Sequence, residues 1–158
     1  MDEIVRSANS ADVDQLSRLE TIARAGIVGV RGGDLRLQEC EPVVDWPMLL
    51  DDDDTVVLAG TIDDHVVAFL VLVMDVRRDR GFVSHVYVEV EARELGLGDA
   101  MVERAIEAVH VAGLSGIESV ALPGDRETKN LFERAGMTAR KLTVYKSLRT
   151  GTFDEPQE

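Results

Sequence analysis

Residues 93–100, RELGLGDA, decide how the rest of this sequence is interpreted. One basic residue precedes two glycines, Gly96 and Gly98, between a β-branched run and an amphipathic run of helical period. A glycine turn at this place is either an ordinary connection or an anion site. The anion site arises because the first N–H groups of a helix point outward and the helix dipole favours negative charge. The surrounding sequence has to distinguish the two.

The 158-residue chain is most simply one domain, residues 1–148, followed by a tail, residues 149–158, that we expect to be disordered. Its composition is 45% hydrophobic and 30% charged, as in globular proteins. Cys40 is the only cysteine, which excludes an internal disulfide and a cysteine-based zinc site and fits a cytoplasmic protein. We find no signal peptide, and the apolar run at residues 66–74 is too short to span a bilayer.

The formal net charge of −13 argues against non-specific binding to nucleic acid or to an anionic membrane. The same field attracts a cationic substrate, although acidic surfaces more commonly serve solubility. Residues 51–54, DDDD, fit a solvated loop or an attractor of polycations. We expect no metal site.

The pattern of apolar residues predicts an α+β domain with helices on the faces of one sheet. Asp63 and Asp64 lie between two β-branched runs and predict a hairpin turn. Residues 29–54 carry weak signals and predict a loop with at most one short helix. Strands are expected at residues 3–8, 55–62, 65–76, 82–90, 117–122 and 139–148, and helices at 9–26, 99–114 and 125–137.

Three chemistries place glycines between a strand and a helix. A dinucleotide fingerprint needs a third glycine where this chain has Met101, and a phosphate-binding P-loop needs a Gly-Lys-Ser/Thr sequence that is absent. A pyrophosphate cradle remains, because glycines allow positive φ and remove the Cβ atoms that would block phosphate oxygens. An ordinary strand-to-helix turn remains as the alternative.

Residues 88–98, VEVEARELGLG, resemble the coenzyme A signature of the GNAT N-acetyltransferase superfamily, in which [R/Q]-x-x-G-x-[G/A] opens a long helix. Arg93, Gly96 and Gly98 fill its positions. Residues 4–19 resemble the first strand and helix of the family, and residues 131–137, LFERAGM, resemble its LYEKLGF motif. The resemblance covers roughly residues 4–148, with residues 29–54 as the variable part.

This resemblance implies the GNAT fold, a mixed central sheet of about six to seven strands flanked by about four helices and splayed between strands 4 and 5. Acetyl-CoA would lie in that gap as co-substrate. The main chain of Tyr87 and Val88 would bind the pantetheine and thioester, and the Val88 N–H would polarise the thioester carbonyl. Further cofactor-binding residues implied by the resemblance are Arg93, Glu94, Leu95, Gly96, Leu97, Gly98, Asp99, Asp125 and Phe132.

The resemblance also exposes departures from the family. Phe132 replaces the tyrosine that usually protonates the coenzyme A thiolate, Asp125 replaces a common asparagine, and Phe82 replaces the glutamate base of some members. Two other residues are candidates for the missing acid and base. Tyr145 is either a proton donor or a packed strand residue. His85 is either a base or a packing or exposed histidine, because alternation directs it away from Phe82 and Val88 unless a β-bulge intervenes.

Little can be inferred about the acceptor. Trp46 and Cys40 lie in the variable segment that shapes the acceptor pocket in this family. Trp46 is a candidate for lining that pocket or for packing, and Cys40 fits a small buried residue. His65 and His110 fit solvent-exposed positions. The acceptor is expected to be a small-molecule or peptide amine, and homodimers are frequent in the family.

The function implied by the resemblance is an acetyl-CoA-dependent N-acetyltransferase, in which a primary amine attacks the thioester directly. The alternative from another class is a GNAT-fold domain that binds acetyl-CoA as a sensor or interaction module without turnover, which Phe132 favours. A purely structural domain would require the glycine motif to be accidental.

Overall fold

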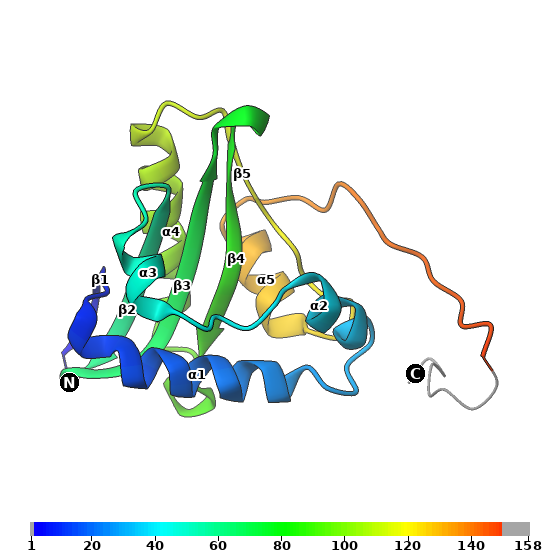
Figure 1. The fold of residues 1–158 in the computed structure, drawn as a ribbon, viewed down its shortest axis with the longest axis horizontal. Helices are drawn as coiled ribbons and strands as arrows, with labels where there is room; N and C mark the ends of the chain where they lie inside the picture. Colours follow the sequence, from blue (N-terminus) through cyan, green and yellow to red (C-terminus); the bar gives the residue numbers. More distant parts are fainter. Residues whose placement is uncertain (1, 150–158) are drawn as a thin grey trace.

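The computed structural model describes residues 2–149 as a five-stranded sheet with helices on both faces (Figure 1). The strands lie in sequence order, and neighbours are antiparallel except that β5 runs parallel to β4. The strands are β1 Glu3–Ser7, β2 Thr55–Ile62, β3 His65–Asp75, β4 Arg80–Val88 and β5 Gly116–Ser119. The α-helices are α1 Val13–Gly26, α2 Gly33–Glu39, α3 Trp46–Asp51, α4 Leu97–Val111 and α5 Arg126–Arg134, and 3-10 turns occur at Ser10–Asp12, Val76–Arg78 and Val90–Ala92.

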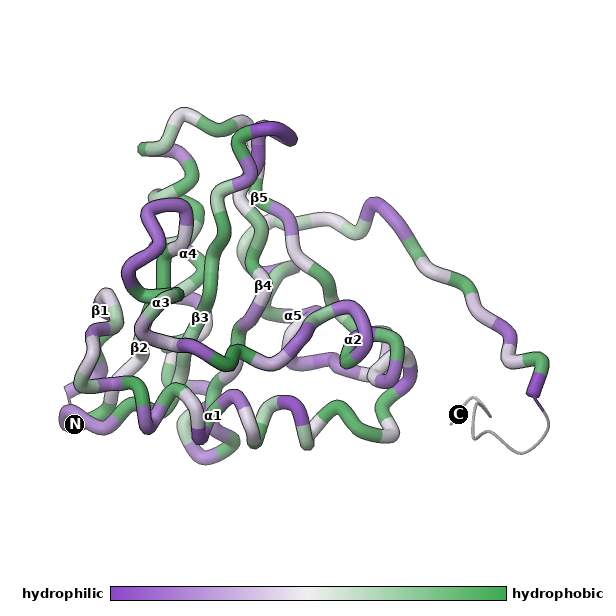
Figure 2. Tube along the Cα trace, in the orientation of Figure 1, coloured by the Kyte–Doolittle hydropathy of each residue, from purple (hydrophilic) through white to green (hydrophobic). Residues whose placement is uncertain are grey.

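The central strand β3 separates two hydrophobic clusters. Leu70 and Leu72 pack on one face with residues of α4 and α5, while Phe69 and Val71 pack on the other with α1 and α3. A strand buried on both faces is apolar along its length, and the hydrophobic colour follows β3 in Figure 2. The chain is therefore a three-layer domain with one sheet in the middle.

The predicted turn at Asp63 and Asp64 is confirmed. Both residues have positive φ, 46° and 68°, and they join β2 to β3 directly. Two left-handed residues match the right-handed twist of the strands, as in a type I′ hairpin. Aspartate adopts this conformation more readily than most residues, which explains the sequence signal.

A β-bulge in β4 changes which side chains share a face. Val71 lies opposite His85 and Leu72 lies opposite Val83, so Ser84 is an extra residue in β4. Strict alternation predicted that Phe82 shares a face with Val86 and Val88 and that His85 faces away from it. That prediction is wrong, because one inserted residue shifts the period by one.

The segment expected as a loop with at most one short helix contains both α2 and α3. Asp45 caps α3, since its Oδ1 accepts a hydrogen bond from the Met48 N–H at 2.9 Å, and Pro47 lies in the first turn. Proline in the first turn costs no hydrogen bond, because those N–H groups have no partner inside the helix. The start signals were present, but each helix is too short to show a period.

The strand expected at residues 139–148 does not form. After α5 these residues have no secondary structure, and in Figure 1 they run away from the sheet. The sheet of the described chain therefore has five strands rather than six or seven. The predicted tail lies outside the described residues except for Arg149. Within residues 2–149 no helix is long and apolar enough to cross a bilayer.

The start of α1 depends on one buried carboxylate. Asp12 is 5% exposed and receives Arg6 Nη1 at 2.7 Å and Nη2 at 2.9 Å, and its Oδ2 also accepts from the Asn9 N–H at 2.8 Å. The Arg6 guanidinium lowers the pKa of Asp12 below its usual range. This one side chain therefore joins β1, the capping box and α1.

Replacing Asp12 with alanine is expected to lower the free energy of unfolding by about 2 kcal/mol, because a cap is lost and Arg6 loses its partner. Urea denaturation at pH 7 measures this. Asp14→Ala, an exposed position in the first turn of α1, is the matched control and should cost less than half as much. Equal losses in the two variants would contradict the role of Asp12.

Candidate functional site

Strands β4 and β5 pair over only part of their length. The parallel ladder joins Arg80–Val83 to Gly116–Ser119, and the Ser119 hydroxyl donates to the Val83 carbonyl at 2.7 Å where the ladder ends. Beyond this point β5 stops while β4 continues to Val88, and the two chains diverge in Figure 1. The predicted splay between the fourth and fifth strands is confirmed.

The register decides which main-chain groups face this gap. Glu89 N donates to Val67 O at 2.9 Å, and alternate residues of an antiparallel strand direct their N–H and C=O groups to the same neighbour. Tyr87, opposite Phe69, therefore faces β3, whereas Val86 and Val88 face the gap. The main chain of Tyr87, which the resemblance assigned to the ligand, therefore faces β3, and that of Val86 faces the gap.

The glycine turn joins the 3-10 turn Val90–Ala92, which follows β4, to α4, and its two glycines are required for different reasons. Gly96 is the N-cap of α4 with φ 86°, and a Cβ built there would meet nothing within 4 Å. Because glycine has no capping side chain, the first N–H groups of α4 are left for an outside acceptor. Gly98 is needed for packing, since a Cβ there would lie 3.2 Å from Leu131 of α5 and 3.6 Å from Val88.

Arg93 and Asp99 use their side chains to fix the turn. Arg93 Nε donates to the Val88 carbonyl at 3.1 Å, and its guanidinium carbon lies 5.9 Å from the centre of the Tyr87 ring. Asp99 forms an ion pair of 2.9 Å with Arg134 of α5. Glu94 adopts φ 71°, an uncommon conformation for a residue other than glycine. Anion binding by residues 93–99 would therefore rest on main-chain groups.

Four further candidate site residues cap a helix, pack in the core or lie on the surface. Asp125 caps α5, with Oδ1 accepting from Thr128 N at 3.2 Å and Oδ2 from the Thr128 hydroxyl at 2.7 Å. Phe132 is 6% exposed and packs in the core beside α4. Trp46 is 3% exposed and packs edge-on against Phe69, which fits the packing alternative. Tyr145 is 63% exposed in the extended segment after α5, not on a strand as expected.

The bulge places His85 in a polar cluster between β4 and the helices α1 and α2. His85 Nδ1 lies 2.8 Å from the Ser84 hydroxyl, and Nε2 lies 3.5 Å from Cys40 Sγ and 3.6 Å from Glu20 Oε1. The Ser84 carbonyl accepts from Arg36 Nη2 at 2.7 Å, as expected for a carbonyl that the bulge has turned out of the ladder.

This cluster holds its histidine neutral. Burial, followed by the charges of Arg36 and Arg24, lowers the pKa of His85 to about 4. Burial raises the pKa of Glu20, while the Val43 N–H, which donates to its Oε1 at 2.9 Å, and Arg24 lower it. At neutral pH the imidazole is therefore an uncharged hydrogen-bonding group and a weak proton acceptor.

Glu20 and Arg36 were missed at the sequence level. Glu20 is 4% exposed and follows Leu16 and Leu19 on the buried face of α1, where a carboxylate has to find polar partners. That position on an apolar stripe was the available signal. Arg36 lies in the short helix α2, and no local pattern links it to the bulge in β4.

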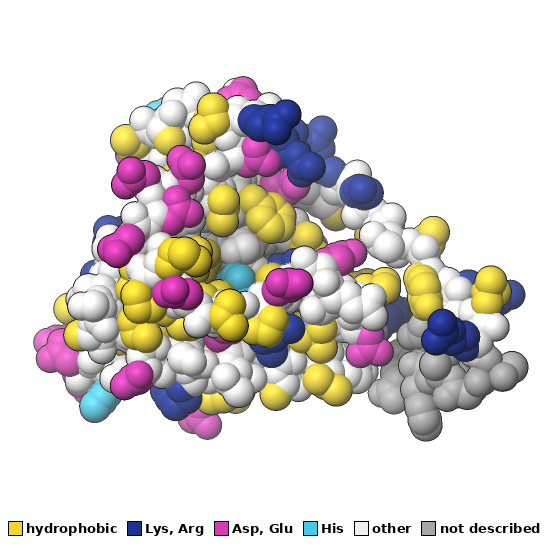
Figure 3. All heavy atoms as spheres, viewed as in Figure 1, with side chains coloured by type: hydrophobic (Ala, Val, Ile, Leu, Met, Phe, Trp, Pro, Cys, Tyr) yellow, Lys and Arg dark blue, Asp and Glu magenta, His cyan; other side chains and the backbone are white. Residues whose placement is uncertain are grey.

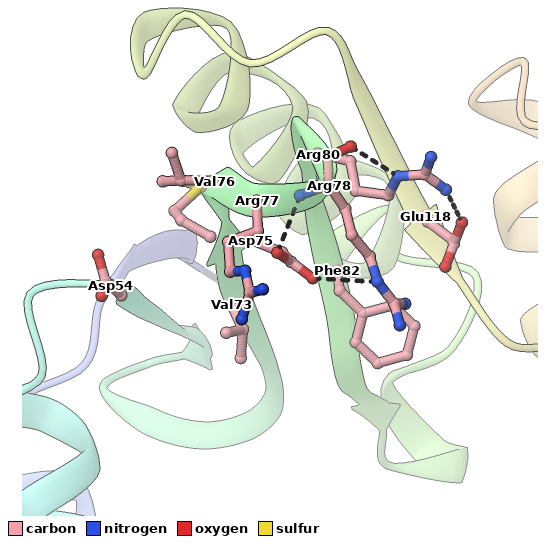
Figure 4. Close-up of a pocket in the computed structure, with 10 residues that line it drawn as sticks. Asp54, Val73, Asp75, Val76, Arg77, Arg78, Arg80, Phe82 and Glu118 are labelled. Atoms are coloured by element: carbon pink, nitrogen blue, oxygen red, sulfur yellow. Dashed lines mark hydrogen bonds and ion pairs between the residues drawn. The ribbon is translucent and has the colours of Figure 1, made fainter.

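A second hollow lies at the other end of β4. Val73, Phe82 and the turn Val76–Arg78 border it, and Figure 4 shows Arg78 directed at Asp75 and Arg80 at Glu118. The Arg78–Asp75 pair spans 3.6 Å, and Arg80 Nε also donates to Arg78 O at 3.2 Å. Arg78 and Arg80 are therefore each paired with a local carboxylate.

The sequence model of the Acetyltransferase (GNAT) family matches residues 28–137, so the chain belongs to this family and is an acetyltransferase. No curated protein matches the chain in sequence.

Three solved structures illustrate the similarity in fold. A variant of the BH1408 protein from Bacillus halodurans has a TM-score of 0.74 and 18% identity over 92% of this chain and 99% of that chain. The aminoglycoside 6'-N-acetyltransferase AAC(6')-Ih from Acinetobacter baumannii has a TM-score of 0.69 and 14% identity over 95% and 100%. A protein from Clostridium acetobutylicum described as a predicted acetyltransferase, solved with acetyl-CoA, has a TM-score of 0.66 and 14% identity over 93% and 97%.

The neutral His85 predicts acid-dependent stability. The unfolded chain binds a proton at this side chain near pH 6.5 and the folded protein only near pH 4, so stability is full above pH 6.5 and is lost as the pH falls. Between pH 7.5 and 5.2 the free energy of unfolding of the wild type should fall by about 1.5 kcal/mol more than that of His85→Gln. Urea titrations at both values measure this.

The raised pKa of Glu20 has the opposite effect on stability, because the cost of burying its charge decreases as the pH falls. Glu20 is present in both the wild type and His85→Gln, so its effect cancels in the comparison. His110→Gln, at an exposed position of α4, is the control and should keep the pH dependence of the wild type. Identical slopes for His85→Gln and the wild type would show that the imidazole is not held neutral.

Proposed function

We propose that this chain transfers an acetyl group from acetyl-CoA to a primary amine by direct attack on the thioester. The observation that carries the proposal is the conjunction of two features. The β4–β5 ladder ends at Val83 and Ser119, and the unpaired part of β4 leads through the 3-10 turn Val90–Ala92 to the uncapped N-terminus of α4. A pantetheine arm fits the open edge as an added strand would, and a diphosphate fits the helix N-terminus.

The diphosphate would be held by main-chain N–H groups rather than by charged side chains. The left-handed Gly96 leaves open space where a Cβ would lie, and the N–H groups of Leu97, Gly98 and Asp99 form the first turn of α4. The net charge of −13 does not forbid this, because exposed charges beyond roughly 8–10 Å are screened at physiological salt.

The acetyl group would be activated by the Val88 N–H. This donor faces the gap, and charge develops on the thioester oxygen as the amine attacks. The bond from the amine nitrogen to the acetyl carbon forms, the carbon–sulfur bond breaks, and coenzyme A leaves as a thiolate. No covalent bond to the protein is needed.

Proton removal from the amine is the harder step. A lysine-like amine has a pKa near 10.4 and is mostly protonated at pH 7, whereas efficient bases have a pKa near the working pH. His85, with a pKa of about 4, is a weak base, so we assign it a positioning role and assign the proton to water. Phe132 has no proton to give, and the leaving thiolate would take its proton from solvent.

The acceptor that fits best is a small cationic amine. The acidic chain attracts cations, and the chain shares its fold with an enzyme that acetylates an aminoglycoside antibiotic. A panel of amino acids, polyamines, aminoglycosides and N-terminal peptides tests this, with free-thiol release from acetyl-CoA as the readout.

Gly96→Val is expected to remove acetyl-CoA binding, because a β-branched side chain would fill the cradle. At a ligand concentration of about 100 Kd, acetyl-CoA should stabilise the wild type by about 2.7 kcal/mol, a rise in melting temperature of about 5–10 °C. The variant should show no rise in thermal shift.

Gly113→Val is the matched control for the same strain. Gly113 has φ 76° and open space around it, and it lies after the opposite end of α4. Both variants should lose similar stability without ligand, and only Gly96→Val should lose the response to acetyl-CoA. Loss of the response in both variants, or in neither, would remove the cradle assignment.

Val88→Pro is expected to lower kcat by about 10²–10³, because it deletes the proposed donor while the β3–β4 ladder, which does not use this N–H, is kept. Val86→Pro deletes the neighbouring edge-facing N–H and should raise the KM for acetyl-CoA with a smaller effect on kcat. Steady-state thiol release with both variants separates the two roles, and an unchanged kcat in Val88→Pro would refute the donor.

A module that binds acetyl-CoA without turnover is the second candidate. Phe132 is buried without a hydroxyl, and Tyr145 lies on an exposed segment away from β4. Thiol release with any amine of the panel would exclude this candidate. Thermal stabilisation by acetyl-CoA together with silence across the whole panel would favour it.

A further inference from the structure

The bulge in β4 decides which of its main-chain groups face the gap beside β5. The Val83 carbonyl accepts from the Ser119 hydroxyl of β5 at 2.7 Å, so Val83 faces β5. Strict alternation from Val83 would turn the main chain of Tyr87 into the gap and that of Val88 toward β3. The extra residue Ser84 reverses this order. The Val88 N–H therefore faces the gap because one peptide group of β4 lies outside the ladder.

The carbonyl of that extra residue is held by one side chain. It accepts from Arg36 Nη2 of α2 at 2.7 Å, a distance typical of a charge-assisted hydrogen bond. A partly buried carbonyl needs a partner, and this one has left the ladder in which its neighbours are paired. The Ser84 hydroxyl is engaged separately, since it lies 2.8 Å from His85 Nδ1. The orientation of the peptide group at the bulge therefore depends on Arg36.

Arg36 can hold the bulge because α2 is itself fixed at both ends. At the C-terminal end, Arg24 of α1 donates from Nη1 to the Cys40 carbonyl at 2.6 Å. At the N-terminal end, Gly32 lies against the segment that follows β5, since a Cβ built there would come within 3.3 Å of the Leu122 side chain. A helix that is tied to α1 and to the β5 side of the gap therefore contacts the β4 side through Arg36.

Arg36 is directed at the main chain rather than at solvent. Its side chain is half-buried. Figure 3 shows acidic side chains spread over the face that carries α2 and α3, whereas the basic side chains between these helices are largely covered. A half-buried arginine that already donates to a carbonyl is suited to hold a peptide group in place.

The side-chain pattern and Arg36 have separate effects on the bulge. His85 lies on the face covered by α1, and moving the insertion past it would turn the imidazole toward the apolar cluster beneath α4. The pattern thus sets where the bulge lies along β4. It does not set the orientation of the extra peptide group, which is left to the hydrogen bond from Arg36.

We propose that Arg36 is a positioning residue of the reaction: by holding the Ser84 carbonyl it fixes the peptide group of the bulge, and thereby the direction of the Val88 N–H into the gap. The inference rests on the proposed function, in which this N–H is the donor to the thioester. Arg36 needs no contact with the cofactor or the reacting atoms, because it acts through the short stretch of β4 between the bulge and Val88. A displacement of about 1 Å in a reacting geometry is enough to change a rate strongly.

Arg36→Met keeps a side chain of similar reach and removes the donor. It should lower kcat for thiol release by about 10–100-fold and keep both the KM for acetyl-CoA and the thermal shift with acetyl-CoA, because the turn that begins α4 is not altered. Arg31→Met, at an exposed position before α2, is the matched control and should keep the kcat of the wild type. In Arg36→Met, a kcat within three-fold of the wild type, or a lost response to acetyl-CoA, would overturn the inference.

Deletion of Ser84 tests how Arg36 acts. Val83 and His85 become adjacent and already lie on opposite faces of β4, so a regular ladder can form in the same register. Because no extra carbonyl is left to hold, Arg36→Met should change kcat by less than two-fold in the shortened chain, and should fold there even if it does not fold in the full chain. A ten-fold loss, or unfolding that Arg36→Met alone causes in this background, would overturn the inference.

A measurement without turnover separates this inference from the proposed function. In amide proton–nitrogen correlation spectra, Arg36→Met should shift the signals of Val86 and Val88, and Arg31→Met should leave them in place. Unmoved signals in Arg36→Met would overturn the inference, whether or not the protein has turnover. Shifted signals in a protein that releases no thiol with any amine of the panel would contradict the proposed function and still support the hold of Arg36 on β4.

Discussion

The early end of the β4–β5 ladder is the constraint on which the rest of this structure depends. Four residue pairs hold the strands together, and the Ser119 hydroxyl takes the Val83 carbonyl that would begin the next pair. Beyond that point Val86 and Val88 present main-chain groups in the middle of a sheet, where such groups are normally paired. Arg93 satisfies the Val88 carbonyl, and main-chain groups of this edge that lack such a partner are costly unless a ligand or water completes them.

The bulge at Ser84 is the second feature that organises the site. It turns one carbonyl toward Arg36 and brings His85 onto the face covered by α1 and α2. The imidazole of His85 then lies within 3.6 Å of both the buried Glu20 carboxylate and the Cys40 thiol, with two arginines nearby. The histidine remains neutral because it is buried and because the charges of Arg36 and Arg24 oppose its protonation.

What could be predicted from the sequence was local. The hairpin at Asp63, the start of α4 and the glycine turn follow from residues adjacent in the chain, and the family motif added the splay. The bulge could not be predicted, since inserting one residue in a β-branched run leaves the composition unchanged and only alters the register. The roles of Asp125 and Trp46 depend on which groups meet in three dimensions. Residues 139–148 have the alternating pattern of a strand, but a pattern within one segment does not provide the neighbouring strand that a sheet requires.

Arg93 links the two ends of the proposed coenzyme site. Its guanidinium connects the turn that begins α4 to the carbonyl at the end of β4, so a shift of the turn is transmitted to Val88, the residue whose N–H would polarise the thioester. Binding of the nucleotide end of the coenzyme would thereby change the reactivity of the distant thioester. A shortened thioester that lacks the nucleotide would then react with a lower kcat, in addition to binding with a lower affinity.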